Sequence, residues 1–206
     1  MAKAVLSKEL EALYTASAKE PAIVDVPRMN YLMIDGKGDP NTSASFQTAM
    51  QTLFGVSYAA KFAVKKRAPS QDYRVMPPEG LWWTDDKSRF DALHKERWKW
   101  TLMIMQPDVV TPELIDEIAA RMREAGKAGA LDRMRLEAFE EGLSVQVLHV
   151  GPYAGEGATI ARMHEFARAN GYEPRGRHHE IYLGDPRRSA PEKLRTILRQ
   201  PVAKRT

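Results

Sequence analysis

Two stretches of this chain, residues 22–105 and 143–202, share one order of expected elements: a strand, a glycine-containing turn, an amphipathic helix and further strands. The turns are Gly36-Lys37-Gly38 and Gly151-Pro152-Tyr153. The copies share little sequence identity, so the argument for an internal duplication rests on the order of elements. It predicts an α+β fold in which two strand-helix-strand-strand repeats form one antiparallel sheet, with the helices on one face and a ligand groove on the other. We expect a single domain over residues 1–206, with a helical connector at about 111–142.

The first repeat begins with strand-like sequence from Ile23 to Ile34, interrupted by Pro27. Thr42 or Ser43 is placed to cap the helix that follows. The apolar residues of this helix recur every three or four positions and predict one buried stripe: Phe46, Met50, Leu53, Phe54, Tyr58 and Phe62. Short strands are expected at 73–76, 80–84 and 98–105.

The connector and the second repeat contain two clear helix patterns. One begins at Thr111-Pro112-Glu113 and runs toward Gly126, with proline in the first turn. The other covers residues 156–170 and ends at Gly171, a typical left-handed stop. Strands are expected at 143–150 and around Glu180, and residues 191–198 predict a short helix packed under the sheet.

Composition excludes several classes of protein. The 206 residues contain no cysteine, which excludes disulfides, thiolate catalysis and cysteine-ligated zinc. No apolar run is long enough to span a bilayer, and the N-terminus has no signal-peptide core. With 43% hydrophobic residues, we expect a folded cytoplasmic protein, either a monomer or a homodimer.

Charge and short motifs give no support for nucleic acid, metal or cofactor binding. The net charge of +4 comes from scattered basic residues without a DNA-binding motif, so we expect no direct nucleic acid binding. His178 and Glu180 share a strand face, but no third metal ligand is evident, and His94, His149 and His164 lack metal spacing. The two glycine turns lack the remaining residues of a dinucleotide or phosphate-loop fingerprint. We therefore expect no metal and no cofactor.

Glu180 is the first candidate for a functional residue. It lies in the sequence His179-Glu180-Ile181-Tyr182-Leu183, which predicts a half-buried strand. An ionised carboxylate in such a strand is costly to desolvate unless a partner or a ligand stabilises it. Two explanations remain open from the residues alone: an ion pair with an arginine at the sheet edge, or a functional site.

Several segments together resemble the GyrI-like (gyrase-inhibitor-like) small-molecule-binding family, and within it the stand-alone subgroup of cyclopropanoid cyclopropyl hydrolases. The similarity covers nearly the whole chain. It rests on residues 55–62, Pro78-Glu79-Gly80-Leu81-Trp82-Trp83, residues 98–107, Gly151-Pro152-Tyr153 and residues 179–201. The Gly-Pro-Tyr motif alone would be a weak sign, whereas the tryptophan segments combined with residues 179–201 are specific for the subgroup.

The resemblance implies a groove that holds a hydrophobic aromatic small molecule, with Glu180 at the position of the family's acidic strand residue. For the hydrolase subgroup it implies addition of water across the strained cyclopropane of duocarmycin-like DNA alkylators. Glu180 is then the general base, and Tyr58 donates a hydrogen bond to the oxygen on which charge develops. The expected ligand-binding residues are Trp82, Trp83, Trp98, Trp100, Met103, Met105, Phe54, His178 and Tyr182.

Other interpretations of these residues stay open. Tyr58 on an apolar helix stripe is equally consistent with a core residue, and tryptophans more often pack a core than line a binding site. Because side chains alternate along a strand, one tryptophan of each pair is expected to face the groove and the other the helices. The alternative functions are a non-catalytic protein that binds, sequesters or senses drugs, linked to transcription regulation, and a protein-interaction inhibitor of the gyrase type.

Overall fold

The computed structural model describes residues 8–85 and 95–205 and divides the chain into two compact units. The first unit comprises Met29–Phe139, and the second comprises residues 8–28 together with residues 140–205. Each unit contains an antiparallel sheet and helices, which confirms the α+β class. The two units are described separately below.

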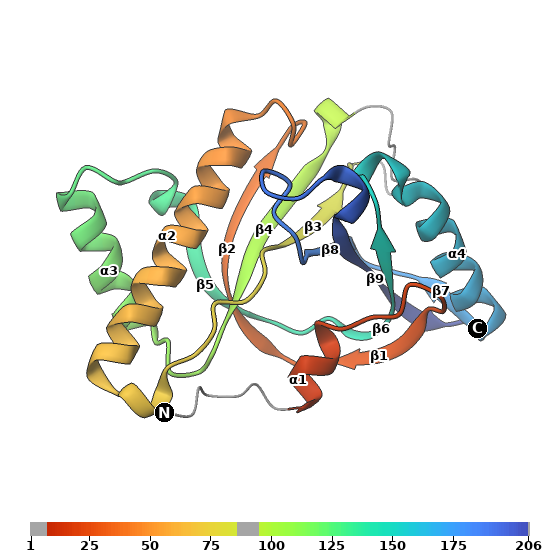
Figure 1. Ribbon diagram of the computed structural model, residues 1–206, viewed down its shortest axis with the longest axis horizontal. Helices are drawn as coiled ribbons and strands as arrows, with labels where there is room; N and C mark the ends of the chain where they lie inside the picture. Colours follow the sequence, from red (N-terminus) through yellow and green to blue (C-terminus); the bar gives the residue numbers. More distant parts are fainter. Residues whose placement is uncertain (1–7, 86–94, 206) are drawn as a thin grey trace. The chain divides into compact units, whose positions relative to one another are not determined.

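In the first unit the strands pair in the order β3-β4-β2-β5. Helix α2 packs on β2 and β4, and α3 packs against α2 (Figure 1). The elements are β2 (Met29–Lys37), α2 (Ala44–Arg67), β3 (Glu79–Trp83), β4 (Lys99–Gln106), α3 (Pro112–Glu124) and β5 (Met134–Phe139), with single 3-10 turns at Pro69–Gln71, Lys95–Arg97 and Leu131–Arg133.

The second unit has a sheet in the order β1-β6-β9-β8, and β7 also pairs with β9. Helix α4 packs on β6, β7 and β9. The elements are α1 (Lys8–Leu13), β1 (Ala22–Val26), β6 (Gly142–Val150), α4 (Glu156–Ala169), β7 (Tyr172–Pro174), β8 (His178–Tyr182) and β9 (Arg195–Lys204), with 3-10 turns at Tyr153–Gly155 and Pro191–Lys193.

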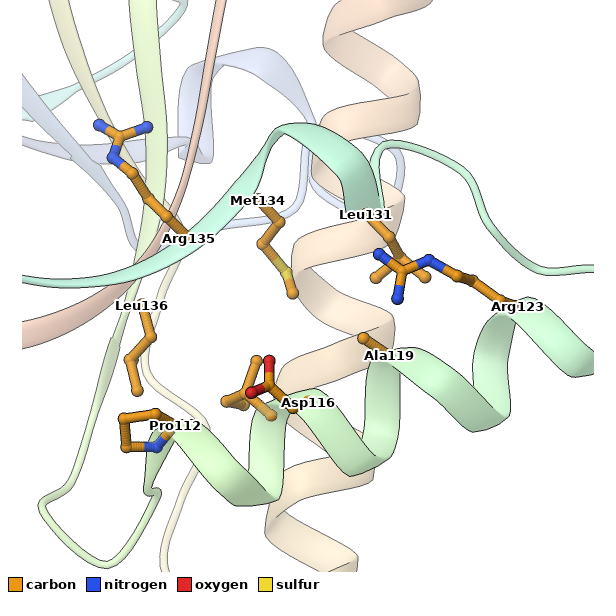
Figure 2. Close-up of a pocket in the computed structure, with 9 residues that line it drawn as sticks. Pro112, Asp116, Ala119, Arg123, Leu131, Met134, Arg135 and Leu136 are labelled. Atoms are coloured by element: carbon orange, nitrogen blue, oxygen red, sulfur yellow. The ribbon is translucent and has the colours of Figure 1, made fainter.

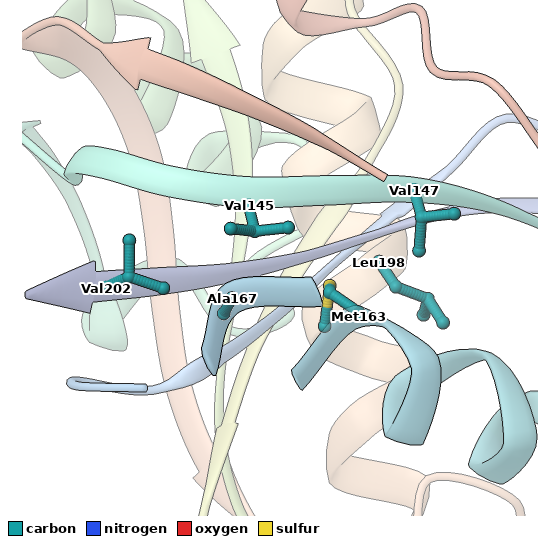
Figure 3. Close-up of a cluster of buried hydrophobic side chains, with 6 residues drawn as sticks. All are labelled: Val145, Val147, Met163, Ala167, Leu198 and Val202. Atoms are coloured by element: carbon teal, nitrogen blue, oxygen red, sulfur yellow. The ribbon is translucent and has the colours of Figure 1, made fainter. Parts of the chain in front are cut away.

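The core between α4 and its sheet follows directly from strand alternation. Val145 and Val147 of β6 and Leu198 of β9 point to the same side and meet Met163 of α4, together with Ala167 and Val202 (Figure 3). Gly171, with a φ of 81°, ends the helix in the left-handed conformation that glycine tolerates. We call the side of the sheet on which Met163 packs the α4 side.

Residues that precede the first strand cover the other side of the same sheet. Tyr14 and Ala16 pack on a cluster of Leu148, Ile181 and Ile197. The backbone N–H of Leu148 donates to the carbonyl of Ser17. The second unit therefore buries both sides of its sheet.

Helices α2 and α3 both begin at a capping side chain, and the cap of α2 is one of the two residues that the sequence predicted. The side chain of Ser43 accepts a hydrogen bond from the N–H of Phe46 at the start of α2, and Thr111 does the same for Leu114 at the start of α3. Pro112 occupies the first helical position, where its missing N–H costs nothing. Pro27 separates β1 from β2, as the sequence predicted.

Three expected elements were wrong. Residues 73–76 form no strand, because this segment pairs with no other strand in the part of the chain that the structure describes. Residues 191–198 are a single 3-10 turn followed by the start of β9, since Ile197 and Leu198 pair with β6 and β8. The connector at 111–142 is not helical throughout, because Met134–Phe139 pairs with β2 as strand β5.

Candidate functional site

Glu180 lies on the α4 side of the sheet in the second unit. It pairs directly with Leu198 of β9, and directly paired residues in an antiparallel sheet point to the same side. Leu198 belongs to the core under α4, so the Glu180 side chain shares that side. Glu180 is 8% exposed, and a carboxylate so deeply buried requires polar partners.

The two oxygens of the Glu180 carboxylate have different neighbours. Tyr182 donates a hydrogen bond of 2.8 Å from its hydroxyl to Oε2. Nε2 of His178 lies 3.5 Å from Oε1. His178, Glu180 and Tyr182 occupy alternate positions of β8 and therefore share one side of the strand, as predicted for His178 and Glu180.

Tyr153 is a functional candidate that the sequence analysis missed. Its ring contacts the ring of Tyr182 edge-on, with 5.9 Å between centroids. Burial, followed by the negative charges of Glu156, Glu180 and Asp185, raises the pKa of Tyr153 to about 12. Its hydroxyl therefore stays protonated at neutral pH. The Gly151-Pro152-Tyr153 motif supported the family resemblance, but nothing in it predicted contact with the Glu180 strand.

Arg199, a buried arginine on the strand next to Glu180, has its partners elsewhere. Arg199 of β9 lies on the side opposite α4, where its guanidinium binds Glu141 at 3.3 Å and also donates to Gln146 and to the carbonyl of Leu13. Nδ1 of His179 lies 3.0 Å from both oxygens of Glu141. In the described residues, Arg199 makes its carboxylate contact with Glu141, so it does not neutralise Glu180.

In this buried cluster of Glu141, His179 and Arg199, the two basic side chains stabilise the ionised form of Glu141. Burial alone would raise the pKa of the Glu141 carboxyl, but the charges and hydrogen bonds of His179 and Arg199 outweigh it and hold that pKa below its usual value. Glu141 is therefore ionised inside the protein. Because Arg199 also binds the Leu13 carbonyl, the cluster fastens the end of α1 to the sheet.

In the first unit, three of the predicted tryptophans form one aromatic cluster. Trp82 and Trp100 pair directly across β3 and β4 and both contact Phe46 of α2, at 5.9 and 5.2 Å between ring centroids. Trp98 meets Trp82 edge-on at 5.4 Å. These three side chains are buried on the α2 side of the sheet.

The other predicted wall residues lie on the opposite side of that sheet. Trp83, Met103 and Met105 alternate with the residues that face α2. Met103 pairs directly with Glu79, and both are fully buried. The expected division of each tryptophan pair is therefore seen for Trp82 and Trp83, which point to opposite sides, whereas Trp98 and Trp100 stay together.

Tyr58 is not on the buried side of α2, which corrects the sequence prediction. It is 47% exposed and lies between Phe54 and Phe62, with centroid distances of 6.3 and 6.4 Å. The buried side instead carries mostly small or aliphatic residues: Ala49, Thr52, Leu53, Val56, Ser57, Ala60 and Val64. Small side chains allow the helix to approach the sheet closely, so the large rings are left on an adjacent side.

A shallow pocket of about 200 Å³ lies elsewhere in the first unit, between α3 and the edge strand β5 (Figure 2). Ile115, Leu131 and Leu136 contribute apolar surface, and Asp116 and Arg123 lie at its side. None of the predicted ligand-binding residues lines it. This pocket therefore does not support the predicted site.

Metal-binding and membrane-spanning features are absent from the residues that the structure describes. Within residues 8–85 and 95–205, no three histidine or acidic side chains are grouped so that they could hold a metal ion. In the same ranges no helix combines the length and apolar character needed to cross a bilayer. His94, which the sequence analysis considered as a ligand, lies outside the described residues.

The helices pack on antiparallel strands, and one strand of the second unit carries a buried glutamate. These features define an α+β protein with a polar site in its second unit. A family model described as the GyrI-like small molecule binding domain matches residues 19–203. The chain therefore belongs to the GyrI-like family of small-molecule-binding domains, as the resemblance implied.

Solved structures agree with this assignment. A crystal structure of an uncharacterized conserved protein from Listeria innocua is 39% identical, with a TM-score of 0.87, and the match covers 95% of this chain and 98% of that chain. A crystal structure of a hydrolase from Listeria innocua is 37% identical, with a TM-score of 0.82 and the same coverage. The C-terminal domain of EcmrR shares the fold alone, at 12% identity, a TM-score of 0.54 and coverage of 90% and 98%. No curated protein matches the chain.

Proposed function

We propose that this GyrI-like domain binds a flat aromatic small molecule and hydrolyses cyclopropanoid DNA-alkylating compounds by adding water across the strained ring. The observation that carries the proposal is the buried Glu180 carboxylate, which the hydroxyl of Tyr182 orients. Two crystal structures of a hydrolase from Listeria innocua, 37% and 38% identical to this chain, support a hydrolytic reaction.

In the proposed reaction, Glu180 takes a proton from a water molecule as the water oxygen attacks the methylene carbon of the cyclopropane. A carbon–oxygen bond forms and one carbon–carbon bond of the cyclopropane breaks. The released electron pair moves through the conjugated system to the carbonyl oxygen, which becomes a phenol after protonation. The hydrated product no longer contains the strained electrophile that alkylates DNA.

Tyr58 is proposed to donate a hydrogen bond to that developing oxyanion. Its exposure suits this role better than a core role, because an exposed hydroxyl is available to a ligand. The side chains on the side of the first unit's sheet opposite α2, Trp83, Met103 and Met105, are proposed to bind the flat ligand through stacking and sulfur contacts. Tyr153, a protonated phenol beside the Glu180 strand, is a second candidate donor to compare with Tyr58.

A non-catalytic binding protein is the second candidate function. The family match itself is to a small-molecule-binding domain, which requires no chemistry. In that case Glu180 would stabilise a polar or cationic group of the ligand, and the compound would be sequestered or sensed while remaining intact. In either case we propose that the ligand is a hydrophobic aromatic molecule and that the protein acts in the cytoplasm.

The test is product formation by mass spectrometry after the purified protein meets a duocarmycin-type cyclopropanoid. We expect a mass gain of one water with the wild type. Glu180→Gln should abolish this product while quenching of tryptophan fluorescence still reports binding. Glu165→Gln, the same substitution at an exposed position of α4, is the matched control and should keep the activity.

The outcomes separate the two candidate functions. If the ligand binds to the wild type but stays intact, the result would favour the non-catalytic binding function. Glu180 and Tyr58 would then have no catalytic role. If Glu180→Gln still forms the hydrated product, the protein is a hydrolase, but its general base is a residue other than Glu180.

A further inference from the structure

The outer strand of the first unit, β5, presents one edge to solvent. Within residues 8–85 and 95–205, β5 ends the order β3-β4-β2-β5 and pairs with β2 alone. Backbone N–H and C=O groups on such an edge readily pair with a strand from another chain. The outer edge of β5 is therefore a candidate surface for contact with a second protein chain.

The backbone groups on this edge belong to the even-numbered residues of β5. Gly38 donates its N–H to the carbonyl of Trp98, so the even-numbered residues at the β2–β4 pairing bond to β4 and the odd-numbered residues of β2 bond to β5. Those odd-numbered residues pair with Arg135 and Glu137, among others, on β5. Leu136, which lies between these two, therefore directs its N–H and C=O outward.

An apolar groove lies beside this edge. The pocket of about 200 Å³ separates β5 from α3, and Ile115, Leu131 and Leu136 supply its apolar surface (Figure 2). A strand added to β5 would place alternate side chains on the α3 side, next to Leu136. The groove therefore fits a partner strand with an apolar residue opposite Leu136.

The charges of β5 fit a second copy of the same strand. Charged residues on an outer strand commonly prevent pairing with other chains, but Arg135 and Glu137 have opposite signs and flank Leu136 symmetrically. If two β5 strands pair antiparallel with Leu136 opposite Leu136 of the partner subunit, Arg135 lies opposite Glu137 of the partner subunit, and the reverse pair forms as well.

Other registers bring like charges together. The outward backbone groups still face each other only if the register shifts by about two residues, the period of a strand. One such shift places Glu137 opposite Glu137 of the partner subunit, and the other places Arg135 opposite Arg135 of the partner subunit. Like charges directly opposite each other destabilise a strand pair, so the charges favour the register centred on Leu136.

The contacts that Arg135 makes within one copy are compatible with this pairing. Its guanidinium bonds to Asp35 at 2.9 Å and to Glu137 at 2.5 Å, and its side chain is 38% exposed. A guanidinium carries more N–H groups than these two carboxylates use. Arg135 can therefore bind Glu137 of the partner subunit without releasing Asp35.

We propose that this protein forms a homodimer in which β5 pairs antiparallel with β5 of a second copy, about a two-fold axis at Leu136. The first-unit strands of the two copies then form one continuous sheet, and each copy covers the other's outer edge. The same surface patch serves both copies, as in most symmetric dimers. The inference goes beyond the proposed function and does not depend on it.

Sedimentation velocity of the full chain over a series of concentrations tests the dimer. We expect a dimer that dissociates on dilution. Glu137→Arg places arginine opposite Arg135 of the partner subunit at both symmetric positions, so the dimer Kd should rise about 10-fold. Glu96→Arg makes the same change of charge at an exposed position of the first unit, and this matched control should leave the Kd unchanged.

Cysteine substitutions test the register, because the natural sequence contains no cysteine. Leu136→Cys should form a disulfide-linked dimer under mild oxidation, since the Cα atoms of directly opposed hydrogen-bonded residues lie about 5.5 Å apart. Ala138→Cys, also half-buried on the same side of β5, is the control. It would lie roughly 14 Å from its counterpart, beyond the reach of a disulfide, and should stay unlinked.

Three results would overturn the dimer. The first is a wild type that sediments as a monomer at every concentration. The second is a dimer whose Kd does not respond to Glu137→Arg, and the third is cross-linking through Ala138→Cys as efficient as through Leu136→Cys, because in both cases the copies meet in another way. None of these measurements uses a ligand, so failure of the dimer leaves the hydrolase proposal untouched.

Discussion

The hydroxyl of Tyr182 donates a 2.8 Å hydrogen bond to Oε2 of Glu180, two residues away on the same side of β8. Neighbours at i and i+2 on a strand point to the same side, so this contact is built into the strand itself. A hydrogen bond to an ionised group is stronger than one between neutral groups. Tyr182 therefore orients the candidate base rather than simply lining a ligand surface.

Replacing Tyr182 by phenylalanine should impair the proposed hydrolysis more than ligand binding. A hydrogen bond to a charged group is worth about 1.5–3 kcal/mol, so we expect kcat to fall about 10-fold or more. Affinity measured by tryptophan fluorescence should change little. Tyr172→Phe, on β7 of the same unit, is the control and should keep its activity. An equal loss of activity in the two variants would show that Tyr182 does not specifically orient Glu180.

Acid should destabilise the second unit through Glu141. Its folded-state pKa lies below the ordinary value of 4.5 because His179 and Arg199 bind the ionised form. The stabilisation is therefore complete above about pH 4.5 and is lost as the pH falls through the lower, folded-state pKa. Denaturant unfolding measured at several pH values should show this fall.

The same carboxylate can be tested by substitution at neutral pH. Glu141→Gln removes one partner of a buried ion cluster, which typically costs about 3–5 kcal/mol. Glu173→Gln breaks the exposed pair with Arg205 and should cost about 1 kcal/mol or less. If the two variants have equal free energies of unfolding, the buried cluster contributes no more than a surface ion pair.

Gly36 should not tolerate a side chain. A Cβ at this position would lie 2.1 Å from the ring of Trp100, which α2 and the sheet hold in place. Gly36→Ala should therefore destabilise the protein by about 1–3 kcal/mol through overpacking. Gly157→Ala on α4 meets no atom within 4 Å and should be neutral or stabilising in thermal unfolding. Similar melting temperatures for the two variants would mean that Trp100 can move aside.

Tyr58 should contribute little to stability. Because it is half exposed, we expect Tyr58→Ala to cost about 1 kcal/mol or less, whereas Leu53→Ala on the buried side of α2 should cost about 2–5 kcal/mol. Tyr58→Phe should lower the proposed hydrolysis at unchanged stability. Equal destabilisation by the two alanine variants would show that the aromatic side of α2 is packed after all.

Much of the local structure could be predicted from short-range sequence patterns. The caps Ser43 and Thr111, the break at Pro27 and the stop at Gly171 each act through the backbone of adjacent residues. Errors arose where a long-range pairing decided the outcome. Residues 191–198 look helical by their apolar spacing, but hydrogen bonding of Ile197 and Leu198 to neighbouring strands outweighs that preference.

By itself, the sequence determined the α+β class, the family and the alternation that sets His178, Glu180 and Tyr182 on one side of a strand, because these depend on local periodicity and motif. Only the tertiary structure decided which side of α2 is buried, that Arg199 binds Glu141, and that Tyr153 lies against Tyr182. These contacts join residues far apart in the chain. Their free energy depends on which surfaces pack together, and no local pattern contains that information.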